Sequence, residues 1–172
     1  GSIAGGSTPL SQGEALFEGV ELGDNAEFDG GLYGRLAWTW LGEAEQTSAF
    51  TRVDTGAVVG VEGNRQPYAP EHTLTVAAGF SRRGFRGEIE AQHVGEQYSD
   101  FANTLAPAAS GQSGLIDSWT VVNAALSYRF ESPFTVFVTV KNLADETYVV
   151  DRTRGIQVGQ PRLYQAGVRY AF

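Results

Sequence analysis

The sequence has no cysteine and only two histidines, His72 and His93, and these shortages limit the chemistry it can support. Without cysteine there is no disulfide, no thiolate nucleophile and no thiolate metal ligand. Neither histidine has a second histidine or an acidic pair at metal-ligand spacing, so we expect no metal and no cofactor. The formal net charge of −8 also argues against a nucleic-acid partner held by general electrostatic attraction.

The sequence also lacks long apolar runs. No stretch approaches the roughly 18–20 apolar residues of a membrane-spanning helix. Residues 1–6 show neither the basic region nor the apolar run of a secretory signal peptide. Taken alone, these absences describe a soluble acidic protein. One class of membrane protein stays compatible with them, because barrel strands alternate between a lipid-facing and a lumen-facing side and are not continuously apolar.

What the sequence does contain favours β-structure. Glycine, at 22 residues, and aromatic residues are abundant, which suits strands joined by many turns better than helices. Period-two alternation is clearest near the C-terminus, where Val122, Leu126 and Tyr128 share one face and Asn123 and Ser127 the other. No helical period competes. The pattern predicts an all-β fold of about seven strands, at residues 14–23, 31–41, 72–81, 85–94, 118–130, 134–142 and 161–172.

The connections between these strands alternate strictly between short and long. An up-and-down meander with short turns at one rim and long loops at the other is typical of outer-membrane barrels, whereas Greek-key sandwiches give no reason for such alternation. We therefore predict an antiparallel up-and-down segment of a transmembrane β-barrel, with its long loops outside and its short turns in the periplasm. The short connections are 24–30, 82–84 and 131–133, and the long ones are 42–71, 95–117 and 143–160.

Aromatic residues fall on the apolar face near both ends of the predicted strands. Barrels carry such aromatic girdles at the two membrane interfaces, so the placement predicts two belts around a band of Leu, Val and Ala. The periplasmic belt comprises Phe80, Tyr128, Phe130, Phe134, Tyr170 and Phe172, and the opposite belt comprises Trp38, Trp40 and Tyr164.

Three motifs follow one another near the C-terminus. Residues 140–148 read Val-Lys-Asn-Leu-Ala-Asp-Glu-Thr-Tyr, residues 159–162 read Gly-Gln-Pro-Arg, and residues 170–172 read Tyr-Ala-Phe. Asn and Asp suit a tight exit from a strand, and Pro at a strand start costs no ladder hydrogen bond. In this order and spacing the motifs resemble the C-terminal barrel portion of the TonB-dependent outer-membrane receptors. The residues that carry the resemblance are Asn142, Leu143, Asp145, Tyr148, Gly159, Pro161 and Arg162.

Upstream segments 13–22, 63–72 and 94–100 also resemble this family, and the last is most similar to the ferric-dicitrate and siderophore branch. The resemblance implies a barrel of about 22 strands in the outer membrane of a Gram-negative bacterium. It further implies a ferric siderophore or iron-citrate-like chelate as ligand, an N-terminal plug on which TonB pulls, and outer-membrane lipid around the wall. Tyr170 and Phe172 resemble the assembly signal that the barrel-assembly machinery reads.

The chain departs from the family in extent. It holds about seven strands, no candidate plug and no segment that engages TonB. We therefore expect residues 1–172 to form one domain, the last part of such a barrel, with the plug absent. This segment would supply part of the wall, three outer loops and the assembly signal, and it could not transport anything alone.

No catalytic arrangement emerges, and we expect no enzyme. Ser113 lies in Gly-Gln-Ser-Gly, which lacks the complete glycine frame of a nucleophile elbow. Asp24, Glu27 and Asp29 cluster in an expected turn, where turn-forming carboxylates explain them better than a bound cation does.

Polar residues on the strands and loops suggest a lumen wall and a ligand site. Glu88 and Glu90 alternate on one strand face with Arg86, as expected for a polar lumen wall. By the resemblance, the ligand is an iron chelate with negative charge, and arginine and amide groups are the natural partners of carboxylates. Each candidate has the alternative of being a solvated loop residue. The candidates at the outer loops are Arg65, Gln97, Asn103, Arg152 and Arg154.

Two other functions stay open at this point. A small self-closing outer-membrane barrel with a structural or adhesive role needs an even number of strands. An eighth strand would have to come from residues 1–12, and residues 5–9, Gly-Gly-Ser-Thr-Pro, argue against it. A soluble ligand-binding β-barrel would need an apolar interior, whereas the inward faces here are polar.

Overall fold

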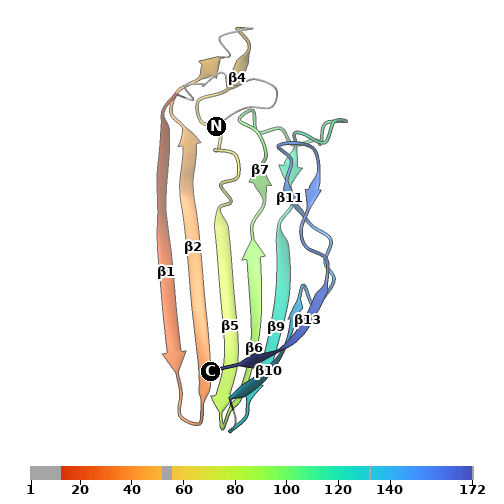
Figure 1. Cartoon of the computed structure of the whole chain (residues 1–172). Helices are drawn as coiled ribbons and strands as arrows, with labels where there is room; N and C mark the ends of the chain where they lie inside the picture. The colour runs from red at the N-terminus through yellow and green to blue at the C-terminus, as the bar shows by residue number, and fades with distance from the viewer. Residues whose placement is uncertain (1–12, 52–55, 132, 172) are drawn as a thin grey trace.

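The computed structural model describes residues 13–51, 56–131 and 133–171, which form one curled antiparallel sheet with long loops at one end (Figure 1). The seven long strands of the sheet are β1 (Ala15–Glu27), β2 (Leu32–Gln46), β5 (His72–Arg82), β6 (Phe85–Val94), β9 (Trp119–Arg129), β10 (Phe134–Lys141) and β13 (Leu163–Tyr170). Each pairs with its neighbour in the order β1-β2-β5-β6-β9-β10-β13, so the described sheet is open at β1 and β13. Within the described ranges, no helix is long and apolar enough to cross a membrane.

The predicted all-β meander is confirmed, but the first two strands are longer than predicted: β1 ends at Glu27 rather than at residue 23, and β2 ends at Gln46 rather than at residue 41. Asp24 and Glu27 were expected in a turn, but both belong to β1, where they pair with Leu36 and Tyr33. Pairing with β2 extends β1 beyond its apolar stretch, and an exposed edge strand tolerates the polar side chains that ended the hydrophobic pattern. The first turn is therefore shorter than expected.

The short turns gather at one end of the sheet, which we call the turn end (Figure 1). Arg83 and Gly84 join β5 to β6 with φ angles of 52° and 82°. Two consecutive positive φ angles define the tight hairpin turn whose twist matches that of the flanking strands. The position of Gly84 admits no other residue readily, because a Cβ there would lie 2.3 Å from the carbonyl oxygen of Arg129.

The long connections gather at the opposite end, the loop end (Figure 1). We call residues 47–71 loop A, residues 95–118 loop B and residues 142–162 loop C. Each loop contains a short antiparallel strand pair that the sequence pattern did not predict, because two or three residues are too few to show alternation. These strands are β3 (Phe50–Thr51) with β4 (Val58–Gly60), β7 (Gln97–Tyr98) with β8 (Leu115–Ile116), and β11 (Val149–Asp151) with β12 (Gln157–Val158).

One face of the sheet is apolar and uncovered. Leu126 pairs with Val138, and their side chains are 48% and 47% exposed. Val136 pairs with Val168, which is 65% exposed. A soluble barrel would bury these rows, and a large exposed apolar surface marks contact with lipid or another apolar partner. The soluble alternative therefore loses its physical basis.

Aromatic rings mark both ends of this apolar face. At the loop end, the ring of Trp38 stacks on His72 at 6.0 Å, and Trp40 Nε1 donates to Glu71 at 3.1 Å. Phe172, which the sequence placed in the opposite belt, lies outside the described residues. The ring pairs at the turn end are Phe80–Phe85, Tyr128–Phe130 and Phe134–Tyr170.

A β-bulge changes the course of β2 as it enters loop A. Glu18 pairs with Glu43 but Val20 pairs with Trp40, so β2 carries one extra residue over this step. Beyond the bulge, Ala44 and Gln46 are 0% and 1% exposed, covered by the loops. The closest packing of the molecule is thus found under the loops rather than between sheets.

Candidate functional site

Tyr68 is the residue at which the three loops meet. It belongs to loop A, and its backbone N–H donates to the carbonyl of Tyr98 in loop B at 2.9 Å. Its hydroxyl lies 2.6 Å from Asp151 Oδ1 and 3.2 Å from Thr153 Oγ1, both in loop C. The same hydroxyl oxygen accepts the backbone N–H of Arg152 at 3.2 Å. Tyr68 therefore links all three loops, through its backbone to loop B and through its side chain to loop C.

Asp151 is the acceptor around which loop C turns. Its Oδ1 also accepts the backbone N–H of Thr153 at 2.8 Å and the hydroxyl of Thr153 at 2.6 Å. These bonds, from Thr153 first and Tyr68 second, lower the pKa of the Asp151 carboxyl to about 2. The pKa of Tyr68 is raised, by burial first and by its bond to the carboxylate second. Both groups keep the form that the hydrogen bond needs at neutral pH.

Arg65, a predicted ligand residue, spans the bulge of β2. Its Nη2 and Nη1 donate to the carbonyls of Leu41 and Gly42 at 2.5 and 3.4 Å, and its Nε donates to Ala69 at 2.7 Å. Leu41 and Gly42 are where the extra residue interrupts the ladder. The guanidinium thus satisfies carbonyls at the bulge and folds loop A back onto β2.

Asn103, also a predicted ligand residue, holds the same part of loop A from loop B. Its Oδ1 accepts the backbone N–H of Arg65 at 2.7 Å, and its Nδ2 donates to the Arg65 carbonyl at 2.8 Å. The side chain mimics a strand partner for Arg65. Its backbone φ of 53° is one that asparagine tolerates better than most residues.

The remaining predicted ligand residues occupy different surroundings. Gln97 is 9% exposed and pairs with Ile116 in the short strands of loop B. Arg154 is exposed on loop C. Arg152 is only 7% exposed, and its Nε and Nη1 are buried without a hydrogen-bond partner among the described residues. Among these five candidates, Arg152 is the one with fully buried donors that lack a partner among the described residues.

The family motif at the start of loop C is a compact hydrogen-bonded turn around Asn142. This residue is 1% exposed and has a φ of 51°. Its Nδ2 donates to the carbonyls of Glu146 and Gln160 at 2.8 and 2.9 Å, and its Oδ1 accepts the backbone N–H of Glu146. Its own N–H donates to Asn123 Oδ1 at 3.1 Å. The motif therefore fixes both ends of loop C.

The other motif residues close the base of loop C. Asp145 accepts the backbone N–H of Arg162 at 3.0 Å and pairs with its guanidinium at 3.2 Å. Gly159 is required by packing, since a Cβ there would lie 2.0 Å from the ring of Tyr148. That ring packs on Trp119, with centroids 4.5 Å apart. Leu143 donates its N–H to Val122 at 2.7 Å, and Pro161 directly precedes Arg162.

The face of the sheet opposite the apolar one carries the expected polar network. Glu88 Oε1 pairs with Arg35 at 2.6 Å, and Glu88 Oε2 accepts the hydroxyl of Tyr33 at 2.7 Å. One step along β6, Glu90 accepts a hydrogen bond from Asn123. Both carboxylates are therefore already engaged in polar contacts between neighbouring strands. No group of three acidic or histidine side chains in the described ranges is gathered as metal ligands would be.

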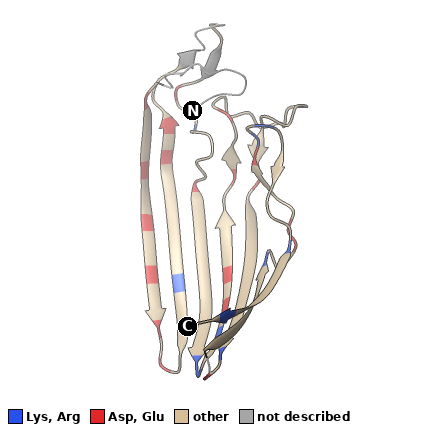
Figure 2. Ribbon diagram, in the orientation of Figure 1, with Lys and Arg blue, Asp and Glu red and all other residues tan. Residues whose placement is uncertain are grey.

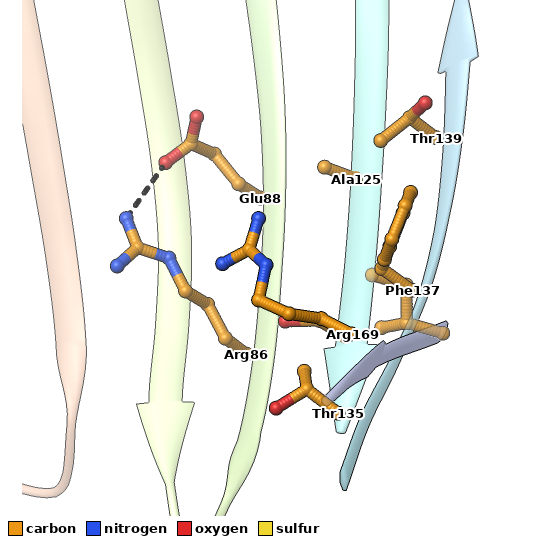
Figure 3. Close-up of a pocket in the computed structure, with 9 residues that line it drawn as sticks. Arg86, Glu88, Ala125, Thr135, Phe137, Thr139 and Arg169 are labelled. Atoms are coloured by element: carbon orange, nitrogen blue, oxygen red, sulfur yellow. Dashed lines mark ion pairs between the residues drawn. The ribbon is translucent and has the colours of Figure 1, made fainter. Parts of the chain in front are cut away.

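This polar face is hollowed toward the turn end. Figure 3 shows Arg86 and Arg169 pointing into one hollow from β6 and β13, and Thr135 and Phe137 of β10 also line it. The hollow measures about 390 Å³. Its single carboxylate, Glu88, lies 3.6 Å from Arg86. This hollow was not predicted, because its residues come from four strands that are brought together only when the sheet forms and curls.

The charges are unevenly distributed over the sheet. Figure 2 shows acidic residues along the whole of β1 and at the loop end of β2, and several basic residues close together near the turn end, where acidic residues are also present. The chain is therefore not uniformly acidic, despite a net charge of −8. Its polar face presents positive charge near the turns.

Sequence reasoning missed Tyr68 and Asp151 as the centre of the loop junction. A local signal exists for Asp151, since Asp-Arg-Thr at 151–153 suits a turn closed by the aspartate side chain. Nothing comparable exists for Tyr68, whose partner lies 83 positions away. Of the assembly-signal residues, Tyr170 pairs with Phe134, and Phe172 lies outside the described residues.

Comparison with known proteins gives consistent results. The family model described as "TonB dependent receptor-like, beta-barrel" matches residues 1–143. The ferric citrate transporter FecA in its unliganded form is 24% identical, with a TM-score of 0.62, over 80% of this chain and 21% of that one. The siderophore receptor PiuA from Acinetobacter baumannii is 20% identical, with a TM-score of 0.69, over 91% of this chain and 21% of that one.

A third match is the ferric-catecholate import receptor Fiu from Escherichia coli K12 in its closed form. It is 19% identical, with a TM-score of 0.69, over 91% of this chain and 21% of that one. The chain thus spans about a fifth of the length of each of these three receptors. At these identities the structures show a shared fold, while the family model covers most of the chain. The chain belongs to the family of TonB-dependent receptor β-barrels.

Proposed function

We propose that this chain is the last part of the barrel of an outer-membrane receptor that takes up a ferric chelate carrying negative charge, of the siderophore or iron-citrate type. The supporting observation is Arg152, which is 7% exposed at the loop junction with Nε and Nη1 unpaired. Unpaired donors on a buried guanidinium are unfavourable, and a ligand with several carboxylates would gain a charge-assisted bond at each of these two nitrogens, which face different sides of the group. Arg154, which is exposed on the same loop, would add a second positive charge near Arg152.

The other predicted ligand residues have supporting roles in this proposal. Arg65 and Asn103 already use their side chains within the protein, so they would hold the loops rather than bind ligand. Gln97 sits on the short strand beside Tyr98, whose carbonyl holds Tyr68. It would contact the ligand only through the small part of its surface that is exposed.

The wider assembly follows from the family. The uncovered apolar face would lie against outer-membrane lipid, and loops A, B and C would face outside. Neighbouring barrel strands would pair with the open edges of β1 and β13. An N-terminal plug, pulled by TonB, would release the ligand inward, and the barrel-assembly machinery would recognise the C-terminal strand with Tyr170 and Phe172.

The test is ligand binding by the receptor that carries this segment, purified in detergent. Ferric citrate and a neutral ferric siderophore are titrated against wild type, Arg152→Gln and Arg154→Gln, with tryptophan fluorescence as the readout. Two lost charge-assisted bonds predict affinity for the anionic chelate at least tenfold weaker in Arg152→Gln, from about 1.5–3 kcal/mol per hydrogen bond to a charged group.

Lys141→Gln is the matched control, because it removes the same charge from an exposed side chain at the end of β10, outside the loop junction. It should bind like wild type. If wild type binds no anionic chelate, or if Lys141→Gln weakens binding as much as Arg152→Gln does, the proposal is wrong.

A further inference from the structure

Arginines gather near the turn end, on the polar face of the sheet and around the β5–β6 turn. Two adjoining hollows, of about 390 and about 410 Å³, share Arg86, Ser127 and Thr135 in their linings. Five of the chain's twelve Lys and Arg residues line these hollows, against one carboxylate, Glu88. In an acidic chain, such a concentration of positive charge calls for an explanation. The five residues are Arg82, Arg83, Arg86, Arg129 and Arg169.

The strand register brings these arginines together. Thr135 of β10 is directly opposite both Arg129 of β9 and Arg169 of β13. The two arginines therefore lie on either side of the threonine, in one row across three strands. Arg86 stands opposite Ser127 in the next row. The curl of the sheet then turns Arg169 toward Arg86, as Figure 3 shows.

The protein does not neutralise this charge from within its described residues. Glu88 is already engaged by Arg35 at 2.6 Å and by the Tyr33 hydroxyl at 2.7 Å, and its contact with Arg86 is a longer 3.6 Å. Within the described ranges, no carboxylate pairs with Arg129 or Arg169. Guanidinium groups brought near one another repel, and an anion bound among them would remove that repulsion.

We infer that these joined hollows, the arginine hollow, form a second anion site, and that it takes a small molecule carrying two or more carboxylates. The volume falls in the range of small-molecule sites. Guanidinium groups from facing strands match separate carboxylates, and the hydroxyls of Thr135 and Ser127 supply neutral donors. The ring of Phe137, over Gly167 where no Cβ could fit, forms an apolar wall for the carbon skeleton.

This site is separate from the loop junction. It lies at the turn end of the sheet, whereas Arg152 lies at the loop end. The inference extends the proposed function, since an anionic ligand that left the loops would meet a second cluster of arginines near the far rim. Its geometry does not depend on that function, and the test below involves neither iron nor uptake.

The experiment is calorimetric titration of free citrate into the full chain, folded in zwitterionic detergent at low salt. We compare wild type, Arg86→Gln/Arg169→Gln and Lys141→Gln. Lys141 is the matched control, because it lies on the same face at the other end of β10. Arg86 and Arg169 are exposed, so their replacement leaves the sheet intact. A second pair, Arg129→Gln/Arg169→Gln, tests the same hollow from another wall.

Wild type should bind citrate saturably, and both double variants should bind at least tenfold more weakly, while Lys141→Gln stays within twofold of wild type. Acetate, with one carboxylate, should bind at least tenfold more weakly than citrate at equal ionic strength. The inference is overturned if citrate does not bind wild type, if Lys141→Gln weakens binding as much as the double variants do, or if acetate matches citrate. It is also overturned if an acidic tetrapeptide binds and citrate does not, because the site would then serve acidic side chains of a polypeptide.

Discussion

The hydroxyl of Tyr68 donates to Oδ1 of Asp151 at 2.6 Å, and this bond joins loop A to loop C across 83 positions of sequence. Tyr68 makes it from a strained backbone, with a φ of 58°. For a bulky residue this conformation costs roughly 1–3 kcal/mol. The hydrogen bonds of Tyr68 to loops B and C offset that cost. These contacts therefore keep loop A in a backbone conformation that would otherwise be unfavourable.

Replacing Tyr68 with phenylalanine should loosen loop C. The variant keeps the ring and loses the bonds to Asp151 and to the N–H of Arg152. A hydrogen bond to a charged group contributes about 1.5–3 kcal/mol, which corresponds to opening that is roughly tenfold or more frequent. Limited proteolysis within residues 142–162, followed by mass spectrometry, measures the change.

Tyr98→Phe is the matched control for this substitution. Tyr98 lies in the neighbouring loop, and within the described ranges its hydroxyl makes no hydrogen bond, while its carbonyl accepts from Tyr68. Removing the hydroxyl should leave cleavage of loop C unchanged. Equal cleavage in Tyr68→Phe and wild type would show that the hydroxyl does not hold the loop.

The same bond should depend on pH at both extremes. The pKa of Asp151 is depressed to about 2 from 3.8, so its contribution is complete above pH 4 to 5 and is lost as the pH falls toward 2. The pKa of Tyr68 is raised above 10, so the hydroxyl's contribution is complete below pH 10 and is lost as the pH rises further. The protection factors of the loop C amides, which are exchange rates corrected for the intrinsic effect of pH on exchange, should therefore be largest between these limits. Asp151→Asn should flatten the acid limb while leaving the alkaline limb in place; an unchanged acid limb would assign it to other carboxylates.

Asn142 should be the most sensitive position of the family motif. Asn142→Ala removes two donated bonds and one accepted bond and leaves alanine at a φ of 51°. At about 0.5–1.5 kcal/mol for each bond, plus about 1 kcal/mol for the backbone, the loss is roughly 3–5 kcal/mol. Urea unfolding in detergent micelles measures it. Asn142→Asp keeps the acceptor and loses the donors, so its loss should fall between those of wild type and alanine.

Adjacent residues of β10 should respond in opposite ways to a charge. Val138 is 47% exposed on the apolar face, whereas Thr139 faces the polar side and bonds to Gln165. An arginine on the lipid face near the middle of a membrane costs about 2–4 kcal/mol, and one facing the lumen costs little. Val138→Arg should therefore lower the free energy of unfolding in lipid vesicles by that amount, and Thr139→Arg by less than about 1 kcal/mol. Equal effects would contradict the assignment of the two faces.

The strands were predictable because membrane-wall strands alternate one residue at a time. In β10, Val136 and Val138 alternate with Thr135 and Thr139, and this alternation can be read directly from neighbouring positions in the sequence. The turns were equally local, since Arg83-Gly84 marks its own hairpin. The end of β1 was mispredicted because its last residues are held by pairing with β2, and side-chain polarity does not record that pairing.

The site was less predictable because its residues meet through the fold rather than through the sequence. Arg65 and Arg152 are both loop arginines in the sequence. In the structure, however, Arg65 donates to backbone carbonyls at a bulge, whereas Nε and Nη1 of Arg152 have no partner among the described residues. Charge and position suggested both as ligand residues. Only the register of β2 and the course of loop C separate them. The arginine hollow could not be predicted from the sequence for the same reason, since Arg86 of β6 and Arg169 of β13 come close only when the sheet curls.

Arg152 provides the last prediction, in which stability and binding should move in opposite directions. Its buried Nε and Nη1 have no partner among the described residues, so the folded loop junction carries an uncompensated charge. Methionine has a similar length and no charge, and replacing buried charge with a well-packed apolar group is often neutral or stabilising by about 1–4 kcal/mol. Arg152→Met should therefore resist proteolysis of loop C at least as well as wild type while binding ferric citrate at least tenfold more weakly. Arg162→Met removes the ion pair between Arg162 and Asp145 at the base of the same loop, and it should instead increase proteolysis of loop C. If Arg152→Met increases proteolysis of loop C as much as Arg162→Met does, then Arg152 stabilises the folded loop, and its unpaired nitrogens are not evidence of an anion site.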